Sequence, residues 1–125
     1  MKSEWATLCE CEGIDVEGSD VTVTFHDGRS HRVTVAETTN EYRLQAVVAR
    51  RAIAERMGRD LPVDVWLRNR AISLVGFRHD SRGRLICEAH VPKAGLAAGE
   101  FQFYLRTIAI ESDRFEYVLT GQDVE

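Results

Sequence analysis

Apolar and polar side chains alternate in two neighbouring segments near the start of the chain. Val21 to Phe25 places apolar residues between threonines, and His31 to Val35 resumes the alternation after the sequence His26-Asp27-Gly28-Arg29. A period of two is typical of a β-strand with one buried face, and Asp-Gly is a common turn sequence. The two segments therefore predict a β-hairpin.

The apolar faces of this hairpin restrict its register. A strict two-residue turn would place Val23 opposite Arg32, and this would put valines and arginines on one face. Pairing Val21 with Val35, and Val23 with Val33, keeps the valines together instead. We therefore expect a loop of odd length, or a bulge at the glycine of the turn.

The segment from Glu41 to Val48 fits two different periods. Its apolar residues alternate from Tyr42 onward, as in a strand, but Leu44, Val47 and Val48 also form a short helical stripe. The alternation beginning on tyrosine favours a third strand, and the helix remains the alternative. The following residues, 52–58, would form a loop or one helical turn.

A short helix is predicted to begin at Asp60 and to end near Asn69. Aspartate is a common N-cap residue, and Pro62 suits the first turn of a helix. Three apolar residues of this helix are expected to face inward: Val63, Trp66 and Leu67.

A second hairpin and a long helix complete the chain. The apolar segments Ile72–Phe77 and Leu85–Val91 flank the turn sequence Asp80-Ser81-Arg82-Gly83. Helical spacing then dominates as far as Gly121, which stands where a C-cap glycine would. The residues of this apolar stripe are Phe101, Tyr104, Leu105, Ile108, Ala109, Ser112, Phe115 and Leu119.

These elements predict a single domain over residues 1–125. It consists of a three-stranded meander, a short middle helix, a hairpin and a long C-terminal helix. The chain is long enough to bury a core, and no linker or repeat divides it. The first eleven residues fit either two turns of helix, through Trp5, Leu8 and Cys9, or a strand.

Charge is distributed unevenly along the chain. The segment Arg43–Arg84 holds ten basic residues against four acidic ones, whereas the whole chain has a net charge of -4. The simplest interpretation is a solvated surface whose arginines pair with acidic residues. The alternative is a nucleic-acid patch, with Tyr42 or Trp66 for stacking and four arginines for phosphates: Arg50, Arg51, Arg56 and Arg59. An overall pI of 5.6 weighs against that alternative.

Residue types used in catalysis or metal binding occur without a consistent pattern. Cys9 and Cys11 lack the second ligand pair that zinc sites usually show, so we predict no metal and no cofactor. His79, Asp80, His90, Glu111 and Asp113 are interpreted as solvated turn and helix charges, because nothing in their spacing places them at one site. The sequence therefore predicts no catalytic residues and no enzyme.

The far side of the C-terminal helix carries three large apolar residues. Phe103, Ile110 and Tyr117 lie about 160° to 200° from Phe101 when each residue advances about 100° around the axis. They recur every seven residues, as in a packed helix seam. Either loops of the chain cover this side, or it meets a partner or a second subunit, and the second interpretation is favoured.

Several segments in about the last 60 residues of the chain share the texture of one known family: Asp60-Leu61-Pro62, Trp66-Leu67-Arg68-Asn69, Ile72–Phe77, Leu85–Val91, Gly95-Leu96, Glu100-Phe101, Tyr104-Leu105-Arg106 and Asp113. In these segments the chain resembles the YbjN family of bacterial regulators. That family is similar to the type III secretion chaperone fold, an α+β domain with a curved antiparallel sheet, commonly dimeric and engaged in binding proteins. The resemblance implies the same fold for this chain.

The resemblance implies a protein-binding role rather than chemistry. We expect a chaperone-like adaptor or regulator that forms a homodimer and binds an unidentified protein client. The chain has no apolar run long enough to span a membrane, and its N-terminal residues, Met1 to Trp5, include an acidic residue where a signal peptide would be apolar. We therefore also expect a cytoplasmic protein without membrane contact. The resemblance also implies an opening amphipathic helix, for which the N-terminal residues offer barely two turns.

Overall fold

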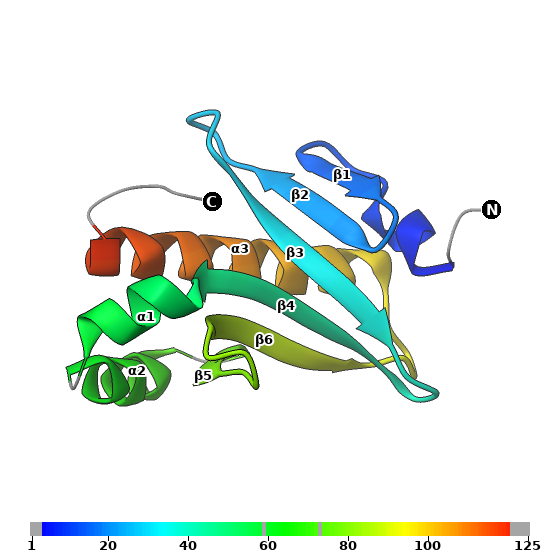
Figure 1. The fold of residues 1–125 in the computed structure, drawn as a ribbon. Helices are drawn as coiled ribbons and strands as arrows, with labels where there is room; N and C mark the ends of the chain where they lie inside the picture. Colours follow the sequence, from blue (N-terminus) through cyan, green and yellow to red (C-terminus); the bar gives the residue numbers. More distant parts are fainter. Residues whose placement is uncertain (1–3, 59, 73, 121–125) are drawn as a thin grey trace.

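A six-stranded antiparallel sheet forms the centre of the protein (Figure 1). The computed structural model describes residues 4–58, 60–72 and 74–120. The strand order is β1-β2-β3-β4-β6-β5. The elements are the 3-10 helix η1 (Glu4–Cys9), β1 (Ile14–Glu17), β2 (Asp20–Thr24), β3 (Ser30–Glu37), β4 (Glu41–Ala49), α1 (Arg51–Met57), α2 (Asp60–Ala71), β5 (Gly76–His79), β6 (Leu85–Pro92) and α3 (Ala98–Thr120).

The long helix α3 covers one face of the sheet, and the core lies between them (Figure 1). Tyr42 on β4 packs edge-on against Phe101 of α3, with ring centroids 5.4 Å apart. Further along, Phe77 on β5 packs against Phe115 at 4.8 Å. Helices α1 and α2 lie at one end of the sheet, and no helix of the described residues crosses the centre of the face opposite α3. Within the described residues, no helix combines the length and the apolar composition that a membrane span requires.

The predicted α+β class and the order of its main elements are confirmed, but the meander has four strands rather than three. The additional strand, β1, pairs with β2 across a turn at Gly18, whose φ of 64° suits glycine. Ile14 and Val16 carry the alternation that indicates this strand. Before it, Glu4–Cys9, within the segment that fitted either helix or strand, forms η1, which buries Trp5 and Cys9.

The register predicted for the hairpin β2–β3 is wrong by two residues. Val21 pairs with Val33, and Val23 pairs with His31, because the loop holds five residues between Thr24 and Ser30. The valines still share the buried face, as the alternation requires, since a shift by two residues does not exchange the faces of a strand. His31 shares this buried face, beside Val23, and is 1% exposed.

The predicted inward face of the middle helix is also wrong. Leu61 and Val65, four residues apart, are the buried residues of α2. The guanidinium of Arg68 lies 5.2 Å from the centre of the Phe115 ring, so its side chain continues the same stripe. Three apolar residues instead lie exposed on what we call the outer face of α2: Val63, Trp66 and Leu67.

Smaller differences concern where elements begin. The segment 41–49 is a strand, as favoured, and residues 51–57 form a full helix rather than one turn. Strand β5 begins only at Gly76, four residues later than predicted, because Leu74 has a φ of 75° that interrupts an extended chain. The predicted cap at Gly121 lies outside the described residues.

Candidate functional site

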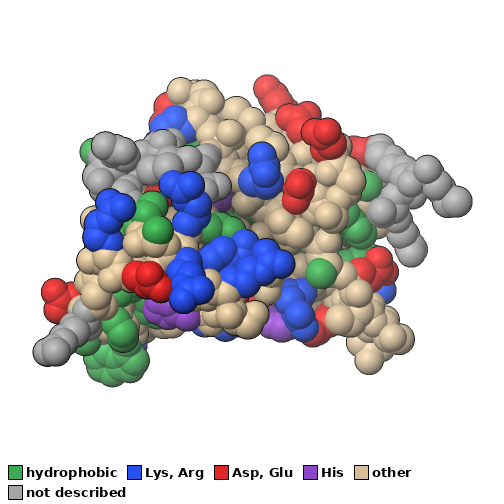
Figure 2. All heavy atoms as spheres, in the orientation of Figure 1, with side chains coloured by type: hydrophobic (Ala, Val, Ile, Leu, Met, Phe, Trp, Pro, Cys, Tyr) green, Lys and Arg blue, Asp and Glu red, His purple; other side chains and the backbone are tan. Residues whose placement is uncertain are grey.

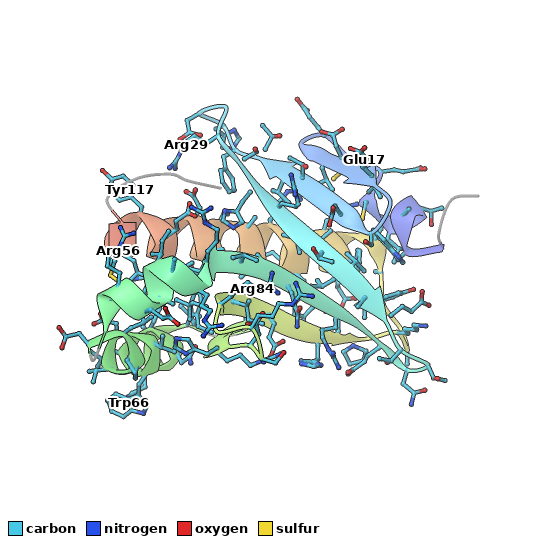
Figure 3. The ribbon with its side chains drawn as sticks, viewed as in Figure 1. Glu17, Arg29, Arg56, Trp66, Arg84 and Tyr117 are labelled. Atoms are coloured by element: carbon cyan, nitrogen blue, oxygen red, sulfur yellow. The ribbon has the colours of Figure 1, made fainter. Side chains whose placement is uncertain are left out.

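Three large apolar side chains lie exposed along α3, on the side away from the sheet. Phe103 is 56% exposed, Ile110 37% and Tyr117 58%. Their seven-residue spacing places them on a line about 21 Å long. We call these three residues the outer face of α3. Tyr117 is labelled in Figure 3, near the end of that helix.

A groove runs beside the middle of this line. Its volume is about 920 Å³, and it lies between α3, the loop joining β2 to β3, and the residues just before β1. Ile110 is the apolar residue that α3 contributes to it. The groove is lined by Glu12, Gly13, Thr24, Phe25, His26, Asp27, Arg29, Arg106, Ile110, Asp113 and Arg114.

Three arginines of the groove contact neighbouring groups. Arg106 donates to the carbonyl oxygen of Glu12 at 3.3 Å, and Arg114 lies 3.4 Å from the carboxylate of Glu111. Arg29 points from its loop toward α3 (Figure 3), where its Nη2 lies 3.0 Å from Oδ2 of Asp113. The contacts of Arg106 and Arg29 connect α3 to the N-terminal segments, and the three arginines surround Ile110 with charge.

The outer face of α2 is a second exposed apolar surface, which the sequence interpretation missed. Val63 and Trp66 are each 57% exposed, and Leu67 is 51% exposed. Arg70 covers part of the Trp66 ring, with its guanidinium carbon 4.9 Å from the centroid. Figure 3 shows Trp66 pointing away from the rest of the molecule. The four-residue spacing of Leu61 and Val65 was the signal that could have shown that Val63, Trp66 and Leu67 face outward.

Of the four arginines considered for nucleic acid, three lie at or within α1, and the tyrosine considered for stacking with them is buried. Arg50 precedes α1, Arg51 begins it and Arg56 lies in its last turn, while Arg59 lies outside the described residues. Arg51 pairs with Glu55, its Nε lying 2.8 Å from Oε1. Tyr42 is buried against Phe101, so its ring cannot stack on a base.

Basic side chains gather instead across the face of the sheet opposite α3 (Figure 2). Several of them pair with carboxylates. Arg78 pairs with Glu88 on the adjacent strand. The hydrogen bond from Arg78 outweighs the opposite effect of burial, so the pKa of Glu88 is lowered. Arg84, labelled in Figure 3, binds Asp80 at 2.7 Å. Burial raises the pKa of Asp80, but hydrogen bonds from Arg84 and Arg82 outweigh it, so the pKa is lowered.

The remaining candidate catalytic residues have separate structural roles. His90 Nδ1 lies 3.0 Å from the carboxylate of Glu41, on the adjacent strand. Asp80 accepts hydrogen bonds from the backbone of its own turn, and Glu111 pairs with Arg114. His79 is exposed on edge strand β5. The structure does not bring these residues together.

The cysteines do not assemble a thiol cluster. Within the described part of the chain, Cys9, Cys11 and Cys87 form no disulfide. Cys87 is buried in β6, and burial raises the pKa of its thiol to about 12. Such a thiol stays protonated at neutral pH and is therefore a poor metal ligand or nucleophile.

One candidate residue is placed differently from the sequence interpretation. Asp113 was expected to be a solvated helix charge, but it is 5% exposed and faces the interior together with Glu116, which is 2% exposed. Glu116 lies about 60° from Phe101 around the helix axis, beside the apolar stripe. The position of Glu116 on the helix was therefore the signal that could have indicated its burial. Both carboxylates lie close to the buried His31.

The fold itself has a solved counterpart. A chain from the crystal structure of the ExsC–ExsE complex superposes with a TM-score of 0.59 at 15% sequence identity, covering 93% of this chain and 88% of that chain. The chain has a type III secretion chaperone-like fold. At this identity the similarity concerns the fold. No protein-family model matches the sequence, and no curated protein matches it.

Proposed function

We propose that this chain is a non-enzymatic protein-binding domain that acts as a chaperone-like adaptor or regulator. The observation that carries the proposal is the likeness of the whole domain to ExsC, a type III secretion chaperone that is seen in complex with ExsE. The likeness extends over nearly the full length of both chains, so it includes the helices as well as the sheet.

The outer face of α3 is the surface that we assign to association. Phe103, Ile110 and Tyr117 are exposed, and fully burying a large apolar side chain contributes roughly 1.5 to 3 kcal/mol. The arginines around Ile110 form a polar rim, as protein interfaces commonly have around an apolar centre. We propose that two copies of the chain meet on this face.

The resemblance of residues 60–113 to the YbjN regulators supports a cytoplasmic, regulatory role within this broader fold. The segments that carry the resemblance lie in or beside α2, β5, β6 and α3. They therefore include the outer face of α2, where Trp66 and its neighbours offer a second apolar surface for a client protein.

Nucleic-acid binding is the competing function. The basic side chains on the sheet favour it (Figure 2), whereas the pairing of Arg51, Arg78 and Arg84 with carboxylates reduces the charge available to phosphates. The net charge of -4 also opposes it.

Affinity capture distinguishes the two functions. The tagged chain and its Trp66→Asp variant are incubated with lysate from the source cells, half of it treated with nuclease. A protein retained by the parent in both halves and lost from the variant supports the proposal. A partner lost only on nuclease treatment supports nucleic-acid binding instead.

A further inference from the structure

His31, Asp113 and Glu116 bring an imidazole and two carboxylates together inside the protein. His31 lies on β3, whereas Asp113 and Glu116 lie three residues apart on α3, so the groups come from both layers of the fold. The exposed fractions of the three residues are 1%, 5% and 2%. One potential ligand atom from each residue lies within 4.8 Å of those from the other two.

The imidazole is held in an orientation that suits metal binding. Its Nε2 lies 3.1 Å from the carbonyl oxygen of Val47, which can only accept, so Nε2 carries a proton. In the neutral ring, Nδ1 is then an acceptor. Nδ1 is buried and has no hydrogen-bond partner among the described residues. Metal-binding histidines commonly donate their other ring N–H to a backbone carbonyl in this way.

We propose that His31, Asp113 and Glu116 bind a divalent transition-metal ion of the zinc class. Imidazole suits zinc and its neighbours in the first transition row, whereas calcium and magnesium prefer oxygen ligands only. Ligand atoms about 2.1 Å from a tetrahedral zinc ion lie about 3.4 Å apart. Starting from separations of at most 4.8 Å, small side-chain rotations close the site.

The residues around the proposed metal site orient the carboxylate of Asp113 and leave a path from solvent. Arg29 Nη2 holds Oδ2 of Asp113 at 3.0 Å, and ligating carboxylates are commonly hydrogen-bonded in this manner. Asp113 also lines the groove beside Ile110, so an ion enters from that side. Three protein ligands leave a fourth position for water. A bound ion would connect β3 directly to α3.

Isothermal titration of the chelator-treated full chain with zinc chloride tests the site. The parent is expected to bind one zinc ion per chain. Glu116→Gln, which keeps the shape of the side chain, should bind zinc at least about tenfold more weakly than the parent. Loss of a residue that only hydrogen-bonds to a metal ligand already weakens metal binding by about that factor. Glu111→Gln, on the same helix and paired with Arg114, is the matched control and should bind like the parent. Absence of zinc binding, or equal binding by Glu116→Gln, overturns the proposal.

Two measurements on the parent test the metal site even if the Glu116→Gln variant does not fold. Zinc should shift the ¹⁵N resonance of His31 Nδ1, and a titration that shifts only His26, His79 and His90 contradicts the site. Cobalt substitution should give a visible spectrum without a thiolate charge-transfer band. A thiolate band would place the metal at Cys9, Cys11 or Cys87 and overturn the assignment.

Discussion

Asn69 and the backbone of Phe77 exchange two hydrogen bonds. Asn69 Nδ2 donates to the carbonyl oxygen of Phe77 at 3.0 Å, and the Phe77 N–H donates to Asn69 Oδ1 at 2.8 Å. The side-chain amide therefore supplies the pair of bonds that a neighbouring strand would give to edge strand β5. This contact attaches α2, and the exposed Trp66 with it, to the sheet.

Asn69→Ala should destabilise the fold. Truncation leaves both backbone groups of Phe77 without their partner in a partly buried position, a loss of about 1 to 3 kcal/mol in the free energy of unfolding. Urea denaturation measures the change. Asn40→Ala, at an exposed residue in the loop between β3 and β4, is the control and should change stability by no more than about 0.5 kcal/mol. An Asn69→Ala change as small as that of the control would show that the paired bonds contribute little.

The sequence predicted those features that depend on periodicity within one element. Alternation identified the strands β2, β3 and β4, and an apolar segment after a turn sequence identified β6. Helical spacing identified α3 with its apolar stripe. The same spacing placed Phe103, Ile110 and Tyr117 on the side of α3 that the structure leaves exposed. These predictions succeeded because a period of two or 3.6 residues is a local property of the chain.

Features that depend on contacts between elements were predicted less well. The register of His31 depends on the length of a loop, and the inward face of α2 depends on how that helix meets Phe115. The pairing of Asn69 with Phe77 was not predicted, because it joins a helix to a strand that periodicity treats separately. The cluster of His31, Asp113 and Glu116 also requires β3 and α3 to be placed together.

The orientation of α2 can be tested by comparing adjacent residues. Val65→Asp places a carboxylate at a position that is 9% exposed and should cost several kcal/mol, because a buried charge without a partner is strongly unfavourable. Trp66→Asp changes a side chain that is 57% exposed and should cost no more than about 1 kcal/mol, including the contact with Arg70. Thermal unfolding followed by circular dichroism compares them. Equal destabilisation would contradict the observed helix orientation.

The ion pair of Arg78 and Glu88 should make stability depend on pH. Because the folded-state pKa of Glu88 is lowered from its ordinary value of 4.5, its contribution is present above that value and is lost as pH falls through the folded-state pKa. Arg78→Met should therefore lower the free energy of unfolding by up to about 1 kcal/mol at neutral pH, a value reduced by the solvent exposure of Arg78.

Urea midpoints at neutral pH and at about pH 3 measure this dependence. The difference between the parent and Arg78→Met should shrink at the lower pH, where Glu88 becomes protonated. Arg51→Met, which removes an exposed pair with Glu55, is the control and should match the parent at both values. A difference that stays constant with pH would show that Arg78 acts through packing rather than charge.

Nucleic-acid affinity should be weak and strongly dependent on salt. Exposed arginines that contact phosphates without reading bases bind through counterion release, so affinity for DNA or RNA should fall steeply as salt rises. Fluorescence anisotropy with several sequences measures it, and the double variant Arg50→Glu and Arg51→Glu serves as the comparison. Sub-micromolar, sequence-selective binding at physiological salt that this variant abolishes would favour the competing function.

The central claim is that the outer face of α3 is an association surface, and sedimentation velocity of the parent, Ile110→Asp and Ile108→Asp tests it most directly. Ile108 is fully buried in the core, whereas Ile110 is 37% exposed on the outer face. The account predicts that the parent sediments as a dimer, that Ile110→Asp sediments as a folded monomer, and that Ile108→Asp unfolds because its charge is buried. A parent that is already monomeric, a dimer that persists in Ile110→Asp, or an Ile110→Asp chain that unfolds like Ile108→Asp would contradict it.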